Sequence, residues 1–422
     1  MMRTRFAYTI LLYLLLPYIG FRLLWRGRKQ PGYWRHIAER FGFFHSHPSK
    51  PVIWLHAVSV GETRAALPLI QQLQTRYPQH QILLTHMTPT GRDTGEELFG
   101  DSVLRSYLPY DFPFAVRRFL KHFKPAIGVL METEIWFNLI HACNTSRIPV
   151  LLINARLSEK SAHQYAKFAQ LTQESLRGLS GIAAQTQVDA ARLTALGARH
   201  IQITGNLKFD ISPPQSAIEL GKALRQQFGE ERPIFLAAST REGEEALLLN
   251  ALQHANMPDL LTVIVPRHPQ RFDAVAALLD KRGICYQRRS ANLAIMSQTQ
   301  VVLGDSMGEM FAYYSACDIA FIGGSLLPLG GQNLIEACAL GKPVLLGPHT
   351  YNFAEVSELA VTVGAAIRVQ DAGELLTQVA ALIQDKQKQR EMRQAGLDFS
   401  RQHQGATDRV MRLVDGYLLV SH

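Results

Sequence analysis

The part of the chain that most constrains its fold lies in the last third, where two short apolar runs flank a stretch of helical spacing. Ile319–Ile322 stops at Gly-Gly, Pro343–Leu346 stops at Gly-Pro, and Asn333–Leu340 lies between them. Apolar runs bounded by turn residues are typical of buried parallel strands, so the pattern predicts a βαβ unit. A helix that begins just after Gly330-Gly331 would direct free backbone N–H groups at an anion, and we expect a nucleotide pocket here. The alternative is an ordinary glycine-rich turn in a doubly wound domain.

The same alternation of short apolar runs and helical patterns covers most of the chain, with a Pro-rich break at residues 211–216. The predicted strands before the break are 52–57, 82–87, 103–107, 127–131, 150–153, 182–184 and 201–204, and those after it are 234–238, 261–265, 301–303, 319–322 and 343–346. Such alternation indicates parallel sheets covered by helices. Because 422 residues exceed what one hydrophobic core supports, we expect two doubly wound domains, residues 31–211 and 212–422, that face each other across a cleft.

Residues 1–30 differ from the rest of the chain. Phe6–Phe21 is almost unbroken apolar sequence, about 24 Å long as one helix and slightly short of a bilayer span. Residues 1–50 hold nine Lys/Arg against one acid, so most of the formal net charge of +9 lies there. Basic residues on both sides of an apolar, aromatic-flanked run indicate an uncleaved membrane anchor facing anionic lipid, with the rest of the chain cytoplasmic, rather than a nucleic-acid binder. A buried core helix is the alternative.

Carboxylates follow two predicted strands of the first domain. Glu62 lies where the strand at 52–57 passes into a helix, so it could take a proton from a hydroxyl nucleophile or merely complement the helix dipole. Glu132 and Glu134 follow the strand at 127–131, and an acid pair there leaves glycoside hydrolysis open. Lys208 follows the last strand of this domain.

Turns rich in cations and hydroxyls follow three predicted strands of the second domain, at residues 238–243, 265–269 and 304–309. Each alone is more often a solvated turn. Because the carboxyl ends of parallel strands lie on one edge of a sheet, we expect all three to meet the turn at Gly331 and Asn333. Together they predict a phosphate and sugar site.

The sequence predicts no metal site. It contains no Asp-x-Asp and no HExxH, and its one HxH, His45-Ser46-His47, lies in a Ser/Pro-containing loop without an evident third ligand. Four separated cysteines without a CxxC pair favour reduced thiols and a cytosolic location. Cations and a helix dipole would then have to neutralise a leaving phosphate.

In combination these motifs resemble a known family. The segments that carry the resemblance are HAVSVGET (56–63), METEIW (131–136), NARLS (154–158), GNLKFD (205–210), VPRHPQRF (265–272), GDSMGEM (304–310) and GGQNLIEACALGKPVLLGPHTYNF (330–353), together with the basic apolar N-terminus. They look like the Kdo transferases of lipopolysaccharide synthesis, which transfer 3-deoxy-D-manno-oct-2-ulosonic acid. The likeness covers nearly the whole chain.

The resemblance implies a GT-B fold, with two Rossmann-like domains facing a cleft, an acceptor domain first and a donor domain second. It implies inverting, metal-independent and cofactor-free transfer from CMP-Kdo to the lipid A precursor, lipid IVA, at the cytoplasmic side of the inner membrane. By the resemblance, Glu62 is the catalytic base, and Glu132 and Lys208 stabilise the transition state. The residues that match the CMP-binding turns are Pro266, Arg267, Met307, Gly308, Glu309, Asn333, Leu334, Ile335 and Glu336.

Two other classes of function share parts of this pattern. Another membrane-surface transferase or a sugar-nucleotide epimerase would have the same turns in its second domain, but the anchor disfavours an epimerase and the VGET and METEIW segments disfavour other transferases. A membrane-tethered nucleotide-binding protein without enzymatic activity would also have the pocket.

Overall fold

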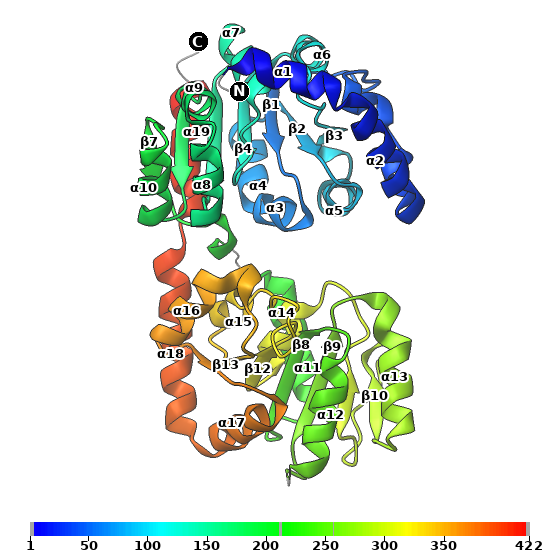
Figure 1. Cartoon of the computed structure of the whole chain (residues 1–422). Helices are drawn as coiled ribbons and strands as arrows, with labels where there is room; N and C mark the ends of the chain where they lie inside the picture. The colour runs from blue at the N-terminus through cyan, green and yellow to red at the C-terminus, as the bar shows by residue number, and fades with distance from the viewer. Residues whose placement is uncertain (1–3, 211–212, 256, 419–422) are drawn as a thin grey trace. The chain divides into compact units, whose positions relative to one another are not determined.

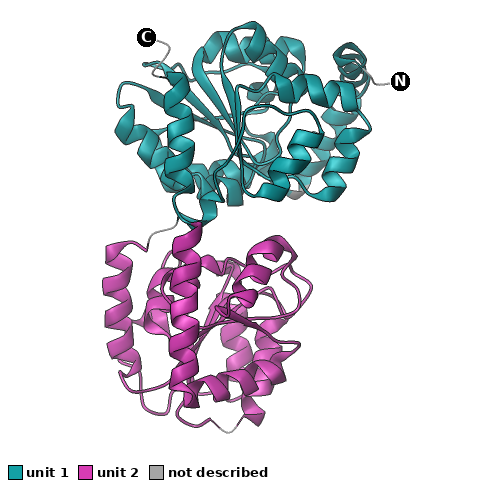
Figure 2. Cartoon of the chain, turned by 90° about the vertical axis from the view of Figure 1, so that its left-hand side faces the viewer, with its two compact units in different colours: residues 1–210, 404–422 teal, residues 211–403 magenta. Residues whose placement is uncertain are grey.

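The computed structural model describes residues 4–210, 213–255 and 257–418, which fall into two compact units (Figures 1 and 2). The first unit comprises residues 1–210 together with 404–422, and the second comprises residues 211–403. The predicted boundary at 211/212 lies outside the described residues. The prediction that the second domain extends to residue 422 differs from the structure, because the segment from Gln404 onwards belongs to the first unit.

The first unit is built on a seven-stranded parallel sheet with the order β3-β2-β1-β4-β5-β6-β7. Its strands are β1 (Val52–His56), β2 (Gln81–His86), β3 (Leu104–Tyr107), β4 (Pro125–Met131), β5 (Val150–Ala155), β6 (Gly181–Ala184) and β7 (Ile201–Ile203). All seven were predicted. The strand order reverses between β1 and β4, and ligands of such sheets bind at the carboxyl ends of the strands on either side of that point.

Helices cover both faces of this sheet, which explains why its strands read as continuous apolar runs. Ile53 and Leu55 of β1 face one layer, while Val52 and Trp54 face the other. The first layer contains α3 (Val60–Ala65), α4 (Leu67–Arg76), α5 (Pro89–Phe99) and α19 (Ala406–Leu418). The second layer contains α6 (Pro113–Phe123), α7 (Phe137–Thr145), α9 (Ala169–Arg177) and α10 (Gln187–Ala195), with α8 (Glu159–Ala166) beside it.

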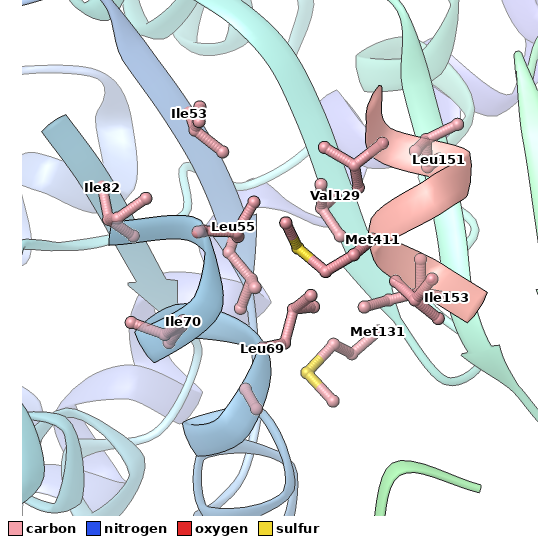
Figure 3. Packing of buried hydrophobic residues seen from close by; sticks show 14 of the residues in the cluster. Ile53, Leu55, Leu69, Ile70, Ile82, Val129, Met131, Leu151, Ile153 and Met411 are labelled. Carbon is pink, nitrogen blue, oxygen red and sulfur yellow. The ribbon is translucent and has the colours of Figure 1, made fainter. Parts of the chain in front are cut away.

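The C-terminal helix α19 is part of the core of the first unit. Met411 lies among Val129, Leu151 and Ile153 of the sheet (Figure 3). The carboxylate of Asp210 accepts hydrogen bonds from the backbone N–H groups of Gly405 and Thr407 at the start of the helix. The helical periodicity of this segment carries no signal that the helix packs on the first sheet.

The second unit has another seven-stranded parallel sheet, in the order β10-β11-β9-β8-β12-β13-β14. Its strands are β8 (Ile234–Thr240), β9 (Leu261–Pro266), β10 (Tyr286–Arg288), β11 (Val301–Leu303), β12 (Ile319–Ile322), β13 (Val344–Leu346) and β14 (Ala366–Arg368). Its helices are α11 (Gln215–Phe228), α12 (Glu244–His254), α13 (Phe272–Lys281), α14 (Met310–Ala316), α15 (Ile335–Ala339), α16 (Ala354–Thr362), α17 (Ala372–Gln384) and α18 (Lys386–His403). The edge strands β10 and β14 were not predicted, because each is short and only partly buried.

The predicted single anchor helix is wrong in one respect, because it consists of two helices, α1 (Arg5–Leu14) and α2 (Leu16–Lys29). Pro17 in the first turn of α2 cannot donate a backbone hydrogen bond, and a break there is the expected result. Within the described residues no single helix has the length and apolar character to cross a membrane. Taken together, α1 and α2 have sufficient length and apolar composition, but they form a pair bent by 54°.

One side of α1 is attached to the first unit by polar contacts. The Tyr8 hydroxyl donates to the buried carboxylate of Asp111 at 3.1 Å, and the Thr9 hydroxyl donates to Asn138 at 3.1 Å. The outward side of both helices is apolar and exposed. Its large side chains are Phe6, Ile10, Leu14, Tyr18, Phe21, Leu24 and Trp25.

Candidate active site

Glu62 lies in the first turn of α3, directly after β1 at the point where the strand order of the first sheet reverses. Ser59 is the N-cap of α3, and its hydroxyl accepts a hydrogen bond from the Glu62 N–H. The Glu62 carboxylate in turn accepts from the Ser59 hydroxyl at 2.9 Å and from the Val58 N–H at 2.8 Å. This reciprocal arrangement resembles a capping box, and it holds the carboxylate at the carboxyl edge of the sheet.

The environment of Glu62 raises its pKa to about 7. Burial is the main cause, since the residue is 7% exposed, and the negative charge of Glu132 is the second cause. Hydrogen bonds from Val58 and Ser59 act in the opposite direction because they stabilise the charged carboxylate. Burial and the charge of Glu132 outweigh these hydrogen bonds. A carboxylate with a pKa near neutrality is suited to accept a proton from a hydroxyl.

Glu132 lies close enough to Glu62 for its charge to raise the pKa of Glu62, and Lys208 pairs with Glu132. Glu132 follows β4 with a left-handed backbone (φ 57°), an uncommon conformation for a residue other than glycine. Its carboxylate Oε1 lies 3.7 Å from the Lys208 Nζ. Glu134 accepts a hydrogen bond from the Trp136 indole at 2.8 Å, and burial raises its pKa. The structure therefore brings together one buried carboxyl group, that of Glu62, and one ion pair, Glu132–Lys208.

A residue that the site prediction missed holds the turn that carries Lys208. Asn154 ends β5 with a left-handed backbone (φ 50°), and its side-chain oxygen accepts a hydrogen bond from the Leu207 N–H at 3.0 Å. Its segment was noted only as a family motif. The one clue to Asn154 in the sequence is that asparagine tolerates a left-handed backbone better than most other residues. Sequence alone, however, does not show at which position a left-handed backbone is required.

In the second unit, cations gather at the carboxyl ends of β8 and β9. The backbone N–H of Arg267 donates to the Thr240 carbonyl at 2.9 Å, which joins the two turns. The pKa of His268 is lowered, first by burial and then by three nearby guanidinium groups, those of Arg241, Arg267 and Arg271. The prediction assigned only Arg267 to the donor site, and Arg271 was not singled out. Arg271 is itself paired with the buried carboxylate of Glu245 at 3.0 Å. The positive charge that attracts an anion such as a phosphate therefore comes mainly from Arg241 and Arg267.

The predicted residues Pro266, Met307, Gly308 and Glu309 lie at the ends of neighbouring strands. Pro266 ends β9, while residues 307–309 follow β11, which pairs with β9. The Ser306 hydroxyl donates to Glu309 at 2.6 Å, and Arg289 lies 3.2 Å from the same carboxylate. The Met307 side chain is 54% exposed and remains available for contact with a ligand.

The glycine-rich turn comes close to its neighbour in the sheet. A Cβ added at Gly323, after β12, would lie 2.5 Å from the carbonyl oxygen of Ser239 near the end of β8, so only glycine fits. Glu244 joins the same two turns, because its carboxylate accepts hydrogen bonds from the N–H groups of Gly324 and Leu326. These contacts fix the backbone at the point where the second sheet reverses its strand order.

The predicted helix at 333–340 is shorter than expected, since α15 spans only Ile335–Ala339. Asn333 precedes it, accepts a hydrogen bond from the Ile335 N–H at 3.1 Å and donates to Glu336 at 3.2 Å. Leu334 and Ile335 are fully buried, so their side chains belong to the core. A five-residue helix has only a small dipole, and the expected anion site at its N-terminus has little support from α15 itself. Within the described ranges no three His, Cys, Asp or Glu side chains gather as metal ligands would.

Comparison with known proteins gives matches over both units. Residues 35–211 match the family described as 3-deoxy-D-manno-octulosonic-acid transferase (kdotransferase), and residues 247–399 match glycosyl transferases group 1. The chain is 42% identical to a 3-deoxy-D-manno-octulosonic acid transferase of Bordetella pertussis, over 98% of this chain and 99% of that protein. A protein of the same description from Haemophilus influenzae is 40% identical with the same coverage. A crystal structure of a glycosyltransferase from Rickettsia africae has a similar fold, with 14% identity, 88% of this chain and 99% of that chain covered, and a TM-score of 0.58.

Proposed function

The chain belongs to the 3-deoxy-D-manno-octulosonic acid (Kdo) transferases and is a glycosyltransferase with two Rossmann-like units. From this premise we propose that it transfers Kdo from CMP-Kdo to lipid IVA, the lipid A precursor. The observation that carries the proposal is identity of 42% and 40% to two Kdo transferases over nearly their whole length. The placement of Glu62 and of the cation cluster supports the mechanism that follows.

In the proposed reaction Glu62 acts as the general base. Its carboxylate takes the proton of an acceptor hydroxyl, whose oxygen attacks the anomeric carbon of Kdo on the face opposite CMP. The bond from that carbon to the CMP phosphate oxygen breaks, CMP leaves with the electron pair, and the configuration inverts. A pKa near 7 supports this role, because a base with that value is substantially ionised at neutral pH and still accepts a proton.

The second unit is proposed to bind CMP-Kdo at the carboxyl edge of its sheet. Arg267, with Arg241 and Arg271 nearby, supplies positive charge for the phosphate and for the Kdo carboxylate. The turn at Met307–Glu309 and the polar side chains of Asn333 and Glu336 are the remaining candidates for CMP contacts. In the first unit, the Glu132–Lys208 pair is proposed to stabilise charge in the transition state.

We place the enzyme at the cytoplasmic side of the inner membrane. Support comes from the exposed apolar side of α1 and α2 and from three exposed arginines on α2, namely Arg22, Arg26 and Arg28. Apolar side chains would enter the bilayer, while the guanidinium groups would attract anionic head groups. The acyl chains of the acceptor would stay in the lipid.

Removing this surface is expected to abolish membrane binding without affecting the donor site. Deletion of residues 1–30, or the milder pair Leu14→Glu and Phe21→Glu, should lower binding to phosphatidylglycerol-containing vesicles by tenfold or more, because burial of each large apolar side chain contributes roughly 1.5–3 kcal/mol. Vesicle sedimentation measures this binding, and calorimetry with CMP measures the donor site. Leu293→Glu, at an exposed leucine of the second unit, is the matched control. Unchanged sedimentation of the Glu variants would mean that another surface binds the membrane.

One experiment tests the proposed function. The full-length protein is incubated with CMP-Kdo and lipid IVA, and the product is identified by mass. Transfer is expected both with and without EDTA, because arginines rather than a metal ion are proposed to neutralise the leaving phosphate. If Kdo remained on CMP, or only hydrolysed CMP-Kdo appeared, the proposed transfer would be wrong. Loss of transferase activity on chelation, restored by Mg²⁺, would contradict metal independence. Asp305 and Glu309 would then be the candidate metal ligands.

A further inference from the structure

The loop between β1 and α3, which precedes Glu62, is held by side chains at the end of β2. His86, the last residue of β2, places its Nδ1 2.9 Å from the Ala57 carbonyl oxygen. The Thr88 hydroxyl donates to the Val58 carbonyl at 3.0 Å. The last backbone hydrogen bond between β1 and β2 runs from the Ala57 N–H to the Thr85 carbonyl. The contacts of His86 and Thr88 therefore hold the loop after β1 beyond the end of the paired strands.

The chemistry of the contact fixes the protonation of His86. A carbonyl oxygen only accepts hydrogen bonds, so Nδ1 must carry the proton. Burial is the main cause that lowers the pKa of His86 to about 4, and the ring is therefore neutral at pH 7 with Nε2 unprotonated. Nε2 has no hydrogen-bond partner within the described part of the chain, and it lies where a Cβ at Gly95 would approach to 2.8 Å. The ring thus fills a closed space with its one donor aimed at the loop.

The loop passes this constraint on to Glu62. Its Val58 N–H and its Ser59 hydroxyl are the two donors to the Glu62 carboxylate. The Ser59 carbonyl accepts a hydrogen bond from the Thr63 hydroxyl at 2.9 Å, and that hydroxyl lies 3.5 Å from His86 Nδ1. If the carbonyls of the loop were released, both donors to Glu62 would lose their fixed positions.

We propose that His86 and Thr88 are positioning residues for the transfer reaction, because they hold the loop whose donors orient the Glu62 carboxylate. The inference rests on the proposed role of Glu62 as base. The other charged groups that face Glu62 are Glu132 and Glu134 from the turn after β4, with Lys208 beside Glu132. These groups lie outside the loop, so loosening it is expected to leave their charges unchanged.

The test compares pH profiles of kcat/KM for full-length variants with CMP-Kdo and lipid IVA. In His86→Leu and Thr88→Val, the midpoint of the rise in kcat/KM at acidic pH, called the acidic limb below, is expected to move upward by about one pH unit. The reason is that hydrogen bonds that stabilise the charged Glu62 carboxylate are weakened. The kcat should also fall by roughly 10- to 100-fold as the base loses its orientation. His86→Asn keeps an N–H donor near the position of Nδ1, and Thr88→Ser keeps the hydroxyl. Both conservative variants should restore most of the activity and the original limb.

Controls separate positioning from general loss of stability. Thr88 is also the N-cap of α5, so Thr186→Val, which removes the N-cap of α10, serves as the matched control and should leave the limb unchanged. Melting temperature and CMP affinity show that each variant is folded. In a Glu62→Gln background, His86→Leu should cause little further loss, because both changes act on the same base.

The outcomes also distinguish this inference from the proposed function. If Glu62→Gln lowers turnover but His86→Leu and Thr88→Val leave both the limb and kcat unchanged, the positioning role is wrong while the base remains. If the losses from His86→Leu and Glu62→Gln are fully additive, the positioning role is also wrong. If Glu62→Gln itself leaves turnover intact, the proposed base is wrong.

Discussion

Replacing Glu62 with glutamine is expected to lower kcat by about 10²–10⁴-fold, which is the usual contribution of a positioned general base. Glutamine keeps the size of the side chain, its oxygen can still accept from the Val58 N–H, and its amide N–H can donate to the Ser59 hydroxyl, but it cannot accept a proton. Because burial and the charge of Glu132 raise the pKa of Glu62 to about 7, the wild-type kcat/KM should rise with pH around a midpoint near 7. The variant should lose that limb, which a pH series of initial rates would measure.

The structure supplies a matched control for the capping role of Glu62. Glu374 occupies the same position in the first turn of α17, where its N–H donates to the N-cap Asp371 at 2.8 Å and its carboxylate accepts from the Gln370 N–H at 2.8 Å. Glu374→Gln removes the same charge from a helix N-terminus, at a cost of about 0.3–1 kcal/mol. Only Glu62→Gln should affect turnover. Normal turnover of Glu62→Gln with a lowered melting temperature would assign the residue to capping and leave Glu132 as the next candidate.

Arg267→Met is expected to weaken CMP binding by roughly 30- to 5,000-fold, since truncating one partner of a desolvated charge pair costs about 2–5 kcal/mol. Arg267 lies at the carboxyl end of β9, among the cations that lower the pKa of His268. Methionine preserves most of the side-chain volume, so the loss should reflect the missing charge and hydrogen bonds. Calorimetry with CMP gives the dissociation constant directly.

Arg390→Met is the control for the loss of one positive charge, because this arginine lies on α18 and its guanidinium bonds only to Gln387 within the described part of the chain. Its CMP affinity should match that of the wild type. Equal affinities of Arg267→Met and Arg390→Met would remove Arg267 from the donor site, and Arg241 and Arg271 would then be the remaining candidates for the phosphate.

The sequence was sufficient for the parts of the fold that depend on local pattern. Short apolar runs such as Val52–His56 identified the central strands, because a strand buried on both faces needs apolar residues at every position. Strand ends then placed Glu62, Glu132 and Arg267 at sheet edges, since parallel strands share one carboxyl edge. Those site assignments remain predictions, but their placement followed from topology alone.

The rest could not be predicted because it depends on contacts between distant residues. The raised pKa of Glu62 requires its burial and the nearby charge of Glu132, neither of which is encoded in spacing. The left-handed backbone of Asn154 depends on the hydrogen bond to Leu207 across two strand ends. Strand β14 is three residues long with one buried position, so its sequence carries almost no periodic signal.

The C-terminal helix α19 has a consequence for the order in which the protein is built. Domains generally fold as they leave the ribosome, with the N-terminal one first. Here the inner sheet face formed by Val129, Leu151 and Ile153 is covered by Met411, which is translated only after the entire second unit. Until then the nascent first unit presents uncovered apolar surface. The unit that is translated first is thus the last to be completed, and chaperones would have the longest access to that face.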